Sequence, residues 1–194
     1  MPSCSGRRRA YGSALCILSL VALAVCLLFD GRTERALRSL WDKLEQRGVA
    51  TLRSHTHGRH HPHLSYVVLL RWRLDAVREA VAALPDRGSF PLVFDALGAF
   101  RRGRVCLVPG VPADLVPRQE VVLAAVRDTG AVVHTHYEVG GWLPHCSVAP
   151  RARLDQLPLV ATTVYDILPL TARIDRAALV DSSTGEVWPL PNLP

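Results

Sequence analysis

The sequence predicts an α+β protein of two related lobes, each with a small antiparallel sheet and helices on one face. Two observations carry this prediction. Strand-like and helix-like patterns alternate along the chain, with the order β-α-β-α-β-β in the first half. The second half gives a looser version of the same order. With 194 residues, 49% of them hydrophobic, the chain can fold around its own core without disulfide bonds.

The predicted helices follow the 3.6-residue period of an amphipathic helix. In the first helix this period places Leu37, Leu40, Trp41 and Leu44 on one face, and Gly48 follows where a left-handed C-cap is expected. The helices are expected at Thr33–Arg47, Leu74–Leu84, Pro112–Thr129 and Leu154–Tyr165. The strands are expected at Val21–Asp30, His63–Arg71, Phe90–Phe94, Arg104–Val108, Val132–Tyr137, His145–Ala149, Leu168–Asp181 and Glu186–Leu190.

The apolar run at residues 12–29 has two interpretations. Three arginines precede it, which is the pattern of a signal anchor, a transmembrane helix or a cleaved signal peptide. Its second half, residues 21–30, also fits a buried core strand that stops at the turn signal Asp30–Gly31. We favour the strand, which makes residues 1–20 an N-terminal extension, residues 21–194 the domain, and the location cytoplasmic. The alternative is a membrane-anchored protein.

The charge and the cysteine content limit the kinds of ligand and the cellular compartment that are expected for the protein. The formal charge is +6, and nearly all the basic residues are arginines, whose planar forks match phosphate groups. The five cysteines contain no CxxC pair, so neither a structural zinc site nor a thioredoxin-like motif is indicated. Their odd number argues against a secreted disulfide framework and favours a reducing compartment.

Two segments share the pattern Pro-His-x-Ser-hydrophobic, and both begin a predicted strand. The first contains His63 and Ser65, and the second contains His145 and Ser147. Because side chains alternate along a strand, the histidine and the serine of each segment point to the same face. If the two strands face each other, two hydroxyls can donate to a phosphate. The two imidazoles can then act as acid and base without a metal.

These residues resemble the two-histidine (2H) phosphoesterase superfamily, whose signature is a pair of H-x-[ST]-x motifs about 80 residues apart. Here the histidines lie 82 positions apart. The rest of the sequence is similar to the 2'-5' RNA ligase-like branch in its opening strand, in its first helix and in the segment Gly141–Pro144 that leads into the second motif. Serine stands at both motif positions where the family more often has threonine, and Cys146 occupies a usually apolar position.

The resemblance implies a bilobal fold, with two antiparallel sheets and outer helices around a central cleft. It implies metal-independent action, with no cofactor, on 2',3'-cyclic phosphates or 2'-5' linkages of RNA ends or nucleotides. His145 is the expected base and His63 the expected acid, although the reverse assignment stays open. Ser65 and Ser147 would hold the phosphoryl oxygens. We expect a monomer.

Other residues have competing interpretations. Tyr66 and Trp142 are possible base-stacking contacts or core and rim residues. The histidine-rich stretch at residues 54–63 could chelate a metal, but a solvated loop is the favoured interpretation, and a surface position is favoured for His134 and His136. The arginines at 101, 102 and 104 could contact phosphates or form a solvated turn. The alternative function is a non-catalytic RNA- or nucleotide-binding module with the same fold.

Overall fold

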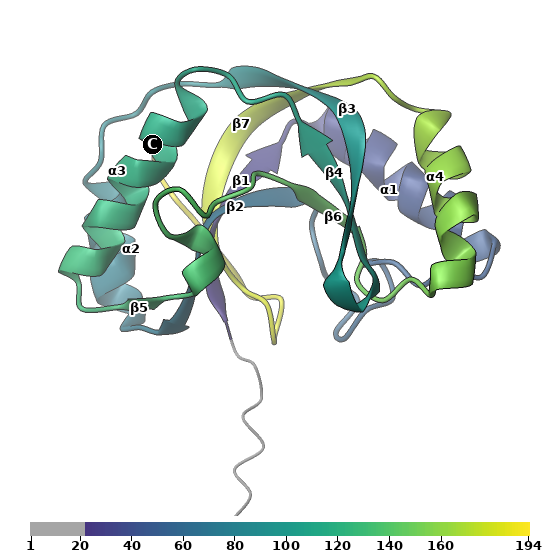
Figure 1. Cartoon of the computed structure of the whole chain (residues 1–194). Helices are drawn as coiled ribbons and strands as arrows, with labels where there is room; N and C mark the ends of the chain where they lie inside the picture. Colours follow the sequence, from purple (N-terminus) through teal and green to yellow (C-terminus); the bar gives the residue numbers. More distant parts are fainter. Residues whose placement is uncertain (1–21) are drawn as a thin grey trace, which may run out of the picture.

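The computed structural model describes residues 22–194, so the extension expected at residues 1–20 lies outside the described part. These residues form an α+β fold with four α-helices and one antiparallel sheet of eight strands (Figure 1). The helices are α1 (Gly31–Gln46), α2 (Leu74–Ala82), α3 (Leu115–Asp128) and α4 (Leu157–Tyr165). The strands are β1 (Leu23–Phe29), β2 (His63–Arg71), β3 (Phe90–Phe100), β4 (Arg104–Pro109), β5 (Val132–Val133), β6 (Cys146–Ala149), β7 (Leu170–Asp181) and β8 (Val187–Pro189).

The strands run in the order β1-β2-β6-β4-β3-β7-β8, β5 joins the free part of β2, and β7 also pairs with β1. The two sheets predicted from the sequence are therefore joined into one hydrogen-bonded surface. The two lobes remain visible in the helices. Helix α2 packs with α3 on one side, and α1 packs with α4 on the other (Figure 1). The α+β class with outer helices is confirmed.

The described part of the apolar run forms strand β1. Its residues pair with β2 along one edge and with β7 along the other, so both rows of backbone groups are used. Its side chains are almost all buried, with Val25 and Leu27 fully enclosed. The strand interpretation is thus confirmed for residues 23–29, which cannot at the same time form part of a membrane helix. None of the helices within residues 22–194 is both long and apolar enough to cross a bilayer.

Helix α1 forms for the reasons that the sequence indicated, with one correction at its start. Leu37, Leu40 and Trp41 are each about 1% exposed and form its buried face. The Asp30–Gly31 pair is not a turn: the carboxylate of Asp30 accepts a hydrogen bond of 2.8 Å from the backbone N–H of Thr33 and caps the helix. Gly48 has a φ of 78°, the left-handed conformation predicted for the C-terminal end.

Three boundaries differ from the predictions. Strand β3 continues to Phe100 and turns through a short 3-10 helix at Arg101–Gly103, where a longer connection was expected. The predicted strand Val132–Tyr137 is a two-residue strand followed by a 3-10 helix at Thr135–Tyr137. The last predicted helix divides into a 3-10 turn, Leu154–Gln156, and α4, which carries a proline in its first turn.

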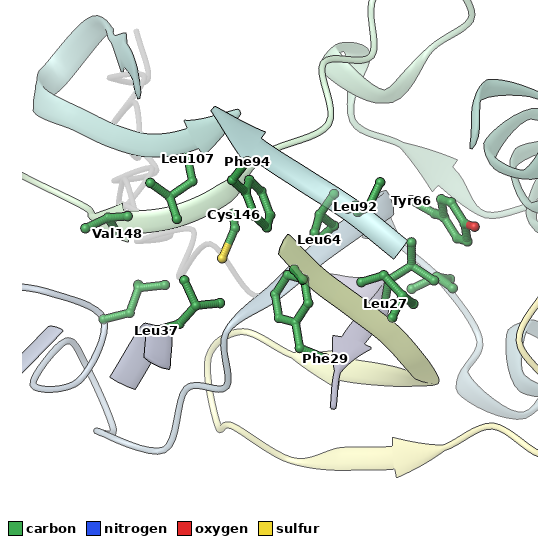
Figure 2. Packing of buried hydrophobic residues seen from close by; sticks show 14 of the residues in the cluster. Leu27, Phe29, Leu37, Leu64, Tyr66, Leu92, Phe94, Leu107, Cys146 and Val148 are labelled. Carbon is green, nitrogen blue, oxygen red and sulfur yellow. The ribbon is translucent and has the colours of Figure 1, made fainter. Parts of the chain in front are cut away.

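The core lies between the curved sheet and the helix pairs. Aromatic and aliphatic side chains from distant parts of the chain meet there, and the rings of Phe29 and Phe94 pack edge to face at 5.9 Å. Figure 2 shows these rings close to Leu64 and to the sulfur of Cys146. Leu64 and Cys146, which stand between the histidine and the serine of each motif, are therefore core residues.

Gln119 of α3 holds two segments that frame the motifs. Its side chain is 1% exposed, and its amide nitrogen donates to the backbone carbonyls of Tyr66 (3.1 Å) and Tyr137 (3.0 Å). We expect Gln119→Met to lower the free energy of unfolding by about 2 kcal/mol, because the buried carbonyl of Tyr66 and the partly buried carbonyl of Tyr137 lose their donor. Urea denaturation measures this change. Glu120→Met, on the exposed side of the same helix, is the control and should leave the stability nearly unchanged; equal effects would contradict the role of Gln119.

Candidate active site

Both Pro-His-x-Ser motifs lie on neighbouring strands and present their polar residues to the same face. Exposure alternates along each strand: His63 and Ser65 are partly exposed, whereas Leu64 is completely buried. His145 and Ser147 are likewise partly exposed, and Cys146 between them is 1% exposed. This two-residue alternation is the one expected for a strand with one buried face.

The strand register brings the two motifs together. Strands β2 and β6 are antiparallel, and Leu64 pairs with Cys146. One residue to either side of this pair, His63 stands across from Ser147 and Ser65 stands across from His145. The sheet thus gathers two imidazoles and two hydroxyls into a single patch, each histidine opposite the serine of the other motif.

The two histidines are held in the same way. The Nδ1 atom of His63 lies 2.7 Å from the carbonyl oxygen of His61, and Nδ1 of His145 lies 2.7 Å from the carbonyl oxygen of Leu143. A carbonyl oxygen only accepts hydrogen bonds, so each Nδ1 carries a proton and donates it. Nε2 of each ring is left as the atom that can exchange a proton with a bound molecule.

The surroundings separate the pKa values of the two rings. Burial lowers the pKa of His145, and the positive charges of His63 and Arg104 lower it further, against the carbonyl of Leu143. Burial also opposes the charged form of His63, but the neighbouring sulfur of Cys26 and the carbonyl of His61 outweigh it and raise the pKa to about 9. At neutral pH, His145 is therefore suited to accept a proton and His63 to donate one.

Residues from other loops complete the surroundings of the patch. The indole N–H of Trp142 donates to the backbone carbonyl of Ser65 at 3.0 Å, which fixes the approach to the second motif against β2. The phenol of Tyr137 lies beside Ser65, and burial raises its pKa to about 12, so it stays protonated. The ring of Phe100 lies 5.5 Å from that of His145.

Residues 33–186 match the sequence model of the 2'-5' RNA ligase superfamily. The match contains both motifs and the described elements from α1 to β7, while β1 and β8 lie outside it. The chain belongs to this superfamily. This membership places the protein among the two-histidine phosphoesterases and confirms the family resemblance of the motifs. No protein of curated function shows significant sequence similarity to it.

The fold of this superfamily member is shared with solved structures. One, described as the crystal structure of a phosphoesterase, is 14% identical with a TM-score of 0.55, over 88% of this chain and 95% of the other. Usb1 of Kluyveromyces marxianus is 13% identical with a TM-score of 0.46, over 88% and 98% of the two chains. Its complex with uridine monophosphate is 14% identical with a TM-score of 0.49, over 89% and 98%. At these identities the first likeness concerns the fold alone.

The structure decides between the two interpretations given for Tyr66, in favour of the core. Tyr66 is fully buried, its ring lies 6.0 Å from that of Trp142, and its hydroxyl donates to the carbonyl of Pro194. It has no free face on which a base could stack. The physical reason is the strand period, because the residue after Ser65 must point into the core. Trp142 is partly buried and donates its N–H to the carbonyl of Ser65, which holds the loop, and base stacking by its ring stays a prediction.

Three residues near the patch lie outside the two motifs. Phe100 is 36% exposed and carries no motif, so no sequence signal marked it. Arg104 begins β4 and lies close enough to His145 to lower its pKa, which agrees with the phosphate-contact interpretation of the arginine cluster. His136 also lowers the pKa of His145, so the segment at residues 134–137 borders the site as well as the surface.

The histidine-rich stretch forms a loop beside the patch. The rings of His57 and His60 lie 4.1 Å apart at a tilt of 37°, and burial and the neighbouring histidines lower the pKa of His60 to about 4. The loop is anchored through Glu45, which accepts hydrogen bonds from the side chains of Thr51 and Ser54. Within residues 22–194, no three histidine, cysteine, aspartate or glutamate side chains come together as a set of metal ligands.

Proposed function

We propose that the protein is a metal-independent phosphoesterase that opens 2',3'-cyclic phosphates or cleaves 2'-5' phosphodiester linkages at RNA ends or in nucleotides. The observation that carries this proposal is the patch of two oppositely tuned imidazoles and two hydroxyls on neighbouring strands. Superfamily membership supports a phosphoesterase, and the exposed Arg104 beside the patch suits an anionic substrate. A cytoplasmic location and a monomeric state stay predictions.

In the proposed reaction, water attacks phosphorus while Nε2 of His145 removes its proton. A new phosphorus–oxygen bond forms as the bond to the ribose oxygen breaks, and Nε2 of His63 donates a proton to that leaving oxygen. The hydroxyls of Ser65 and Ser147 donate to the non-bridging oxygens, where negative charge increases in the transition state. The next cycle requires a proton to pass from His145 back to His63 through solvent.

The rate is expected to follow a bell-shaped pH profile. His145 must be neutral, so kcat/KM falls as the pH drops through its pKa, which lies below the usual 6.5. His63 must be protonated, so kcat/KM falls again as the pH rises through about 9. Measurement of kcat/KM between about pH 5 and pH 10 checks both limbs. A rate that keeps rising above pH 9 would contradict the role of His63 as acid.

The second candidate is a binding module that keeps this fold without turnover. Hydrolysis of a 2',3'-cyclic nucleotide and of a 2'-5'-linked dinucleotide by the full chain in EDTA separates the two functions. We expect turnover of at least one substrate, unaffected by the chelator. Saturable binding of both without turnover would support the module, whereas turnover abolished by EDTA would contradict the metal-independent mechanism.

A further inference from the structure

Each motif serine has a buried cysteine beside it on the neighbouring strand. Cys26 of β1 pairs with Ser65 of β2, and Cys106 of β4 pairs with Ser147 of β6. The sulfur-to-oxygen distance is 3.8 Å in both pairs, within reach of a thiol–hydroxyl hydrogen bond. The cysteines are 0% and 1% exposed, so neither thiol has access to water as an alternative partner.

The two pairs are arranged symmetrically around the patch. Strands β2 and β6 are neighbours, with β1 on the outer side of β2 and β4 on the outer side of β6. The serines therefore lie on the inner strands and the cysteines on the outer ones. The same thiol–hydroxyl contact occurs in both halves of the site, on strands far apart in the sequence.

The direction of these hydrogen bonds follows from what a phosphate can accept. A phosphate oxygen offers lone pairs, so a serine that binds it must donate its hydroxyl hydrogen. The serine oxygen can then accept from the thiol beside it. Burial raises the pKa of Cys106 to about 11, so this thiol keeps its hydrogen at neutral pH. A thiol that donates to the serine oxygen in this way leaves the serine hydrogen free to point toward the substrate.

We infer that Cys26 and Cys106 are positioning residues, whose thiols orient the hydroxyls of Ser65 and Ser147 toward the bound phosphoryl group. The inference rests on the proposed function and extends it to the strands behind the motifs. It also gives a reason for cysteine at these two buried positions, where any small apolar side chain would fill the space.

A double-mutant cycle tests the coupling of each thiol to its serine. Cys106→Ala is expected to lower kcat roughly fivefold with little change in KM, since a thiol is a weak donor. In a Ser147→Ala background the same change should have no further effect. In a Ser65→Ala background the fivefold loss should persist. Cys26→Ala should show the reverse pattern: it should have no further effect on kcat in the Ser65→Ala background, and its loss should persist in the Ser147→Ala background.

The chain offers a matched control in Cys146. It is equally buried and stands next to Ser147 in sequence, but it points into the core on the opposite face (Figure 2). Cys146→Ala should leave kcat unchanged, with thermal unfolding recorded for all three variants. The inference would be overturned if Cys26→Ala or Cys106→Ala lowered kcat equally in both serine backgrounds. It would also be overturned if Cys146→Ala lowered kcat as much as they do, because the effect would then be merely structural.

If the wild-type protein turns over neither substrate, both the proposed function and this inference are contradicted. If it turns over a substrate but the double-mutant cycles show no coupling between each thiol and its serine, only the inference is contradicted.

Discussion

Replacing His145 with alanine is expected to lower kcat for a 2',3'-cyclic nucleotide by about a thousandfold, with a much smaller change in KM. The ring is the proposed base, and removal of a positioned general base costs on the order of 10² to 10⁴ in rate. Because the neutral form of His145 dominates at pH 7, nearly every wild-type molecule has an active base at this pH, and the alanine variant loses the whole of its contribution to the rate. Steady-state kinetics on the purified variant measures the loss.

His63→Ala should cause a similar loss on the same substrate, but for a different reason. As the proposed acid, His63 is needed only while the leaving oxygen requires a proton. On a nitrophenyl phosphodiester, whose leaving group departs unprotonated, His63→Ala should therefore lose about tenfold or less, while His145→Ala still loses about a thousandfold. The opposite pattern would reverse the two roles.

A histidine outside the patch serves as the control for both variants. His57 lies in the histidine-rich loop, against Gly185 in the turn before β8, and contacts neither motif. His57→Ala should keep the wild-type rate on both substrates. If its loss matched that of His63→Ala, the histidine-rich loop would have to be included in the catalytic machinery.

The serines give the second large effect. Ser65→Ala and Ser147→Ala should each lower kcat by about a hundredfold, because each hydroxyl stabilises charge that grows on the phosphoryl oxygens in the transition state. The double variant Ser65→Ala/Ser147→Ala should approach the loss seen for a histidine variant. Comparison of kcat with KM separates this effect from weaker binding of the substrate alone.

Threonine is the matched replacement, since it keeps the hydroxyl and adds only a methyl group. Ser65→Thr and Ser147→Thr should retain kcat to within about tenfold of wild type, well above the alanine variants. A loss as large as that of alanine would mean that packing against the cysteines, rather than the hydroxyl, sets the rate. A change in KM with unchanged kcat would restrict the serines to ground-state binding.

The sequence predicted the patch well because its geometry depends on a local period. Alternation along a strand is enough to place His63 with Ser65 and His145 with Ser147. One residue further along the strand, the same alternation places Tyr66 in the core, which is one of the two interpretations given for it. Helix α1 was predictable for a similar reason, since its buried face repeats with the helical period.

The remaining parts of the site depend on contacts between distant segments. Cys26 meets Ser65 only because a bulge between Val25 and Cys26 shifts the register of β1 against β2. A one-residue slip would turn the thiol to the other face, and no local pattern fixes such a shift. Phe100 and Arg104 reach the patch through the turn between β3 and β4, whose extent the composition of the loop did not indicate.

The most direct test compares the full chain with the double variant His63→Ala/His145→Ala, purified identically, for hydrolysis of 2',3'-cyclic nucleotides in EDTA. We expect steady turnover by the wild-type protein and no turnover above the uncatalysed rate by the double variant, with both proteins showing the same thermal unfolding. Hydrolysis by the double variant at the wild-type rate would contradict the two-histidine mechanism.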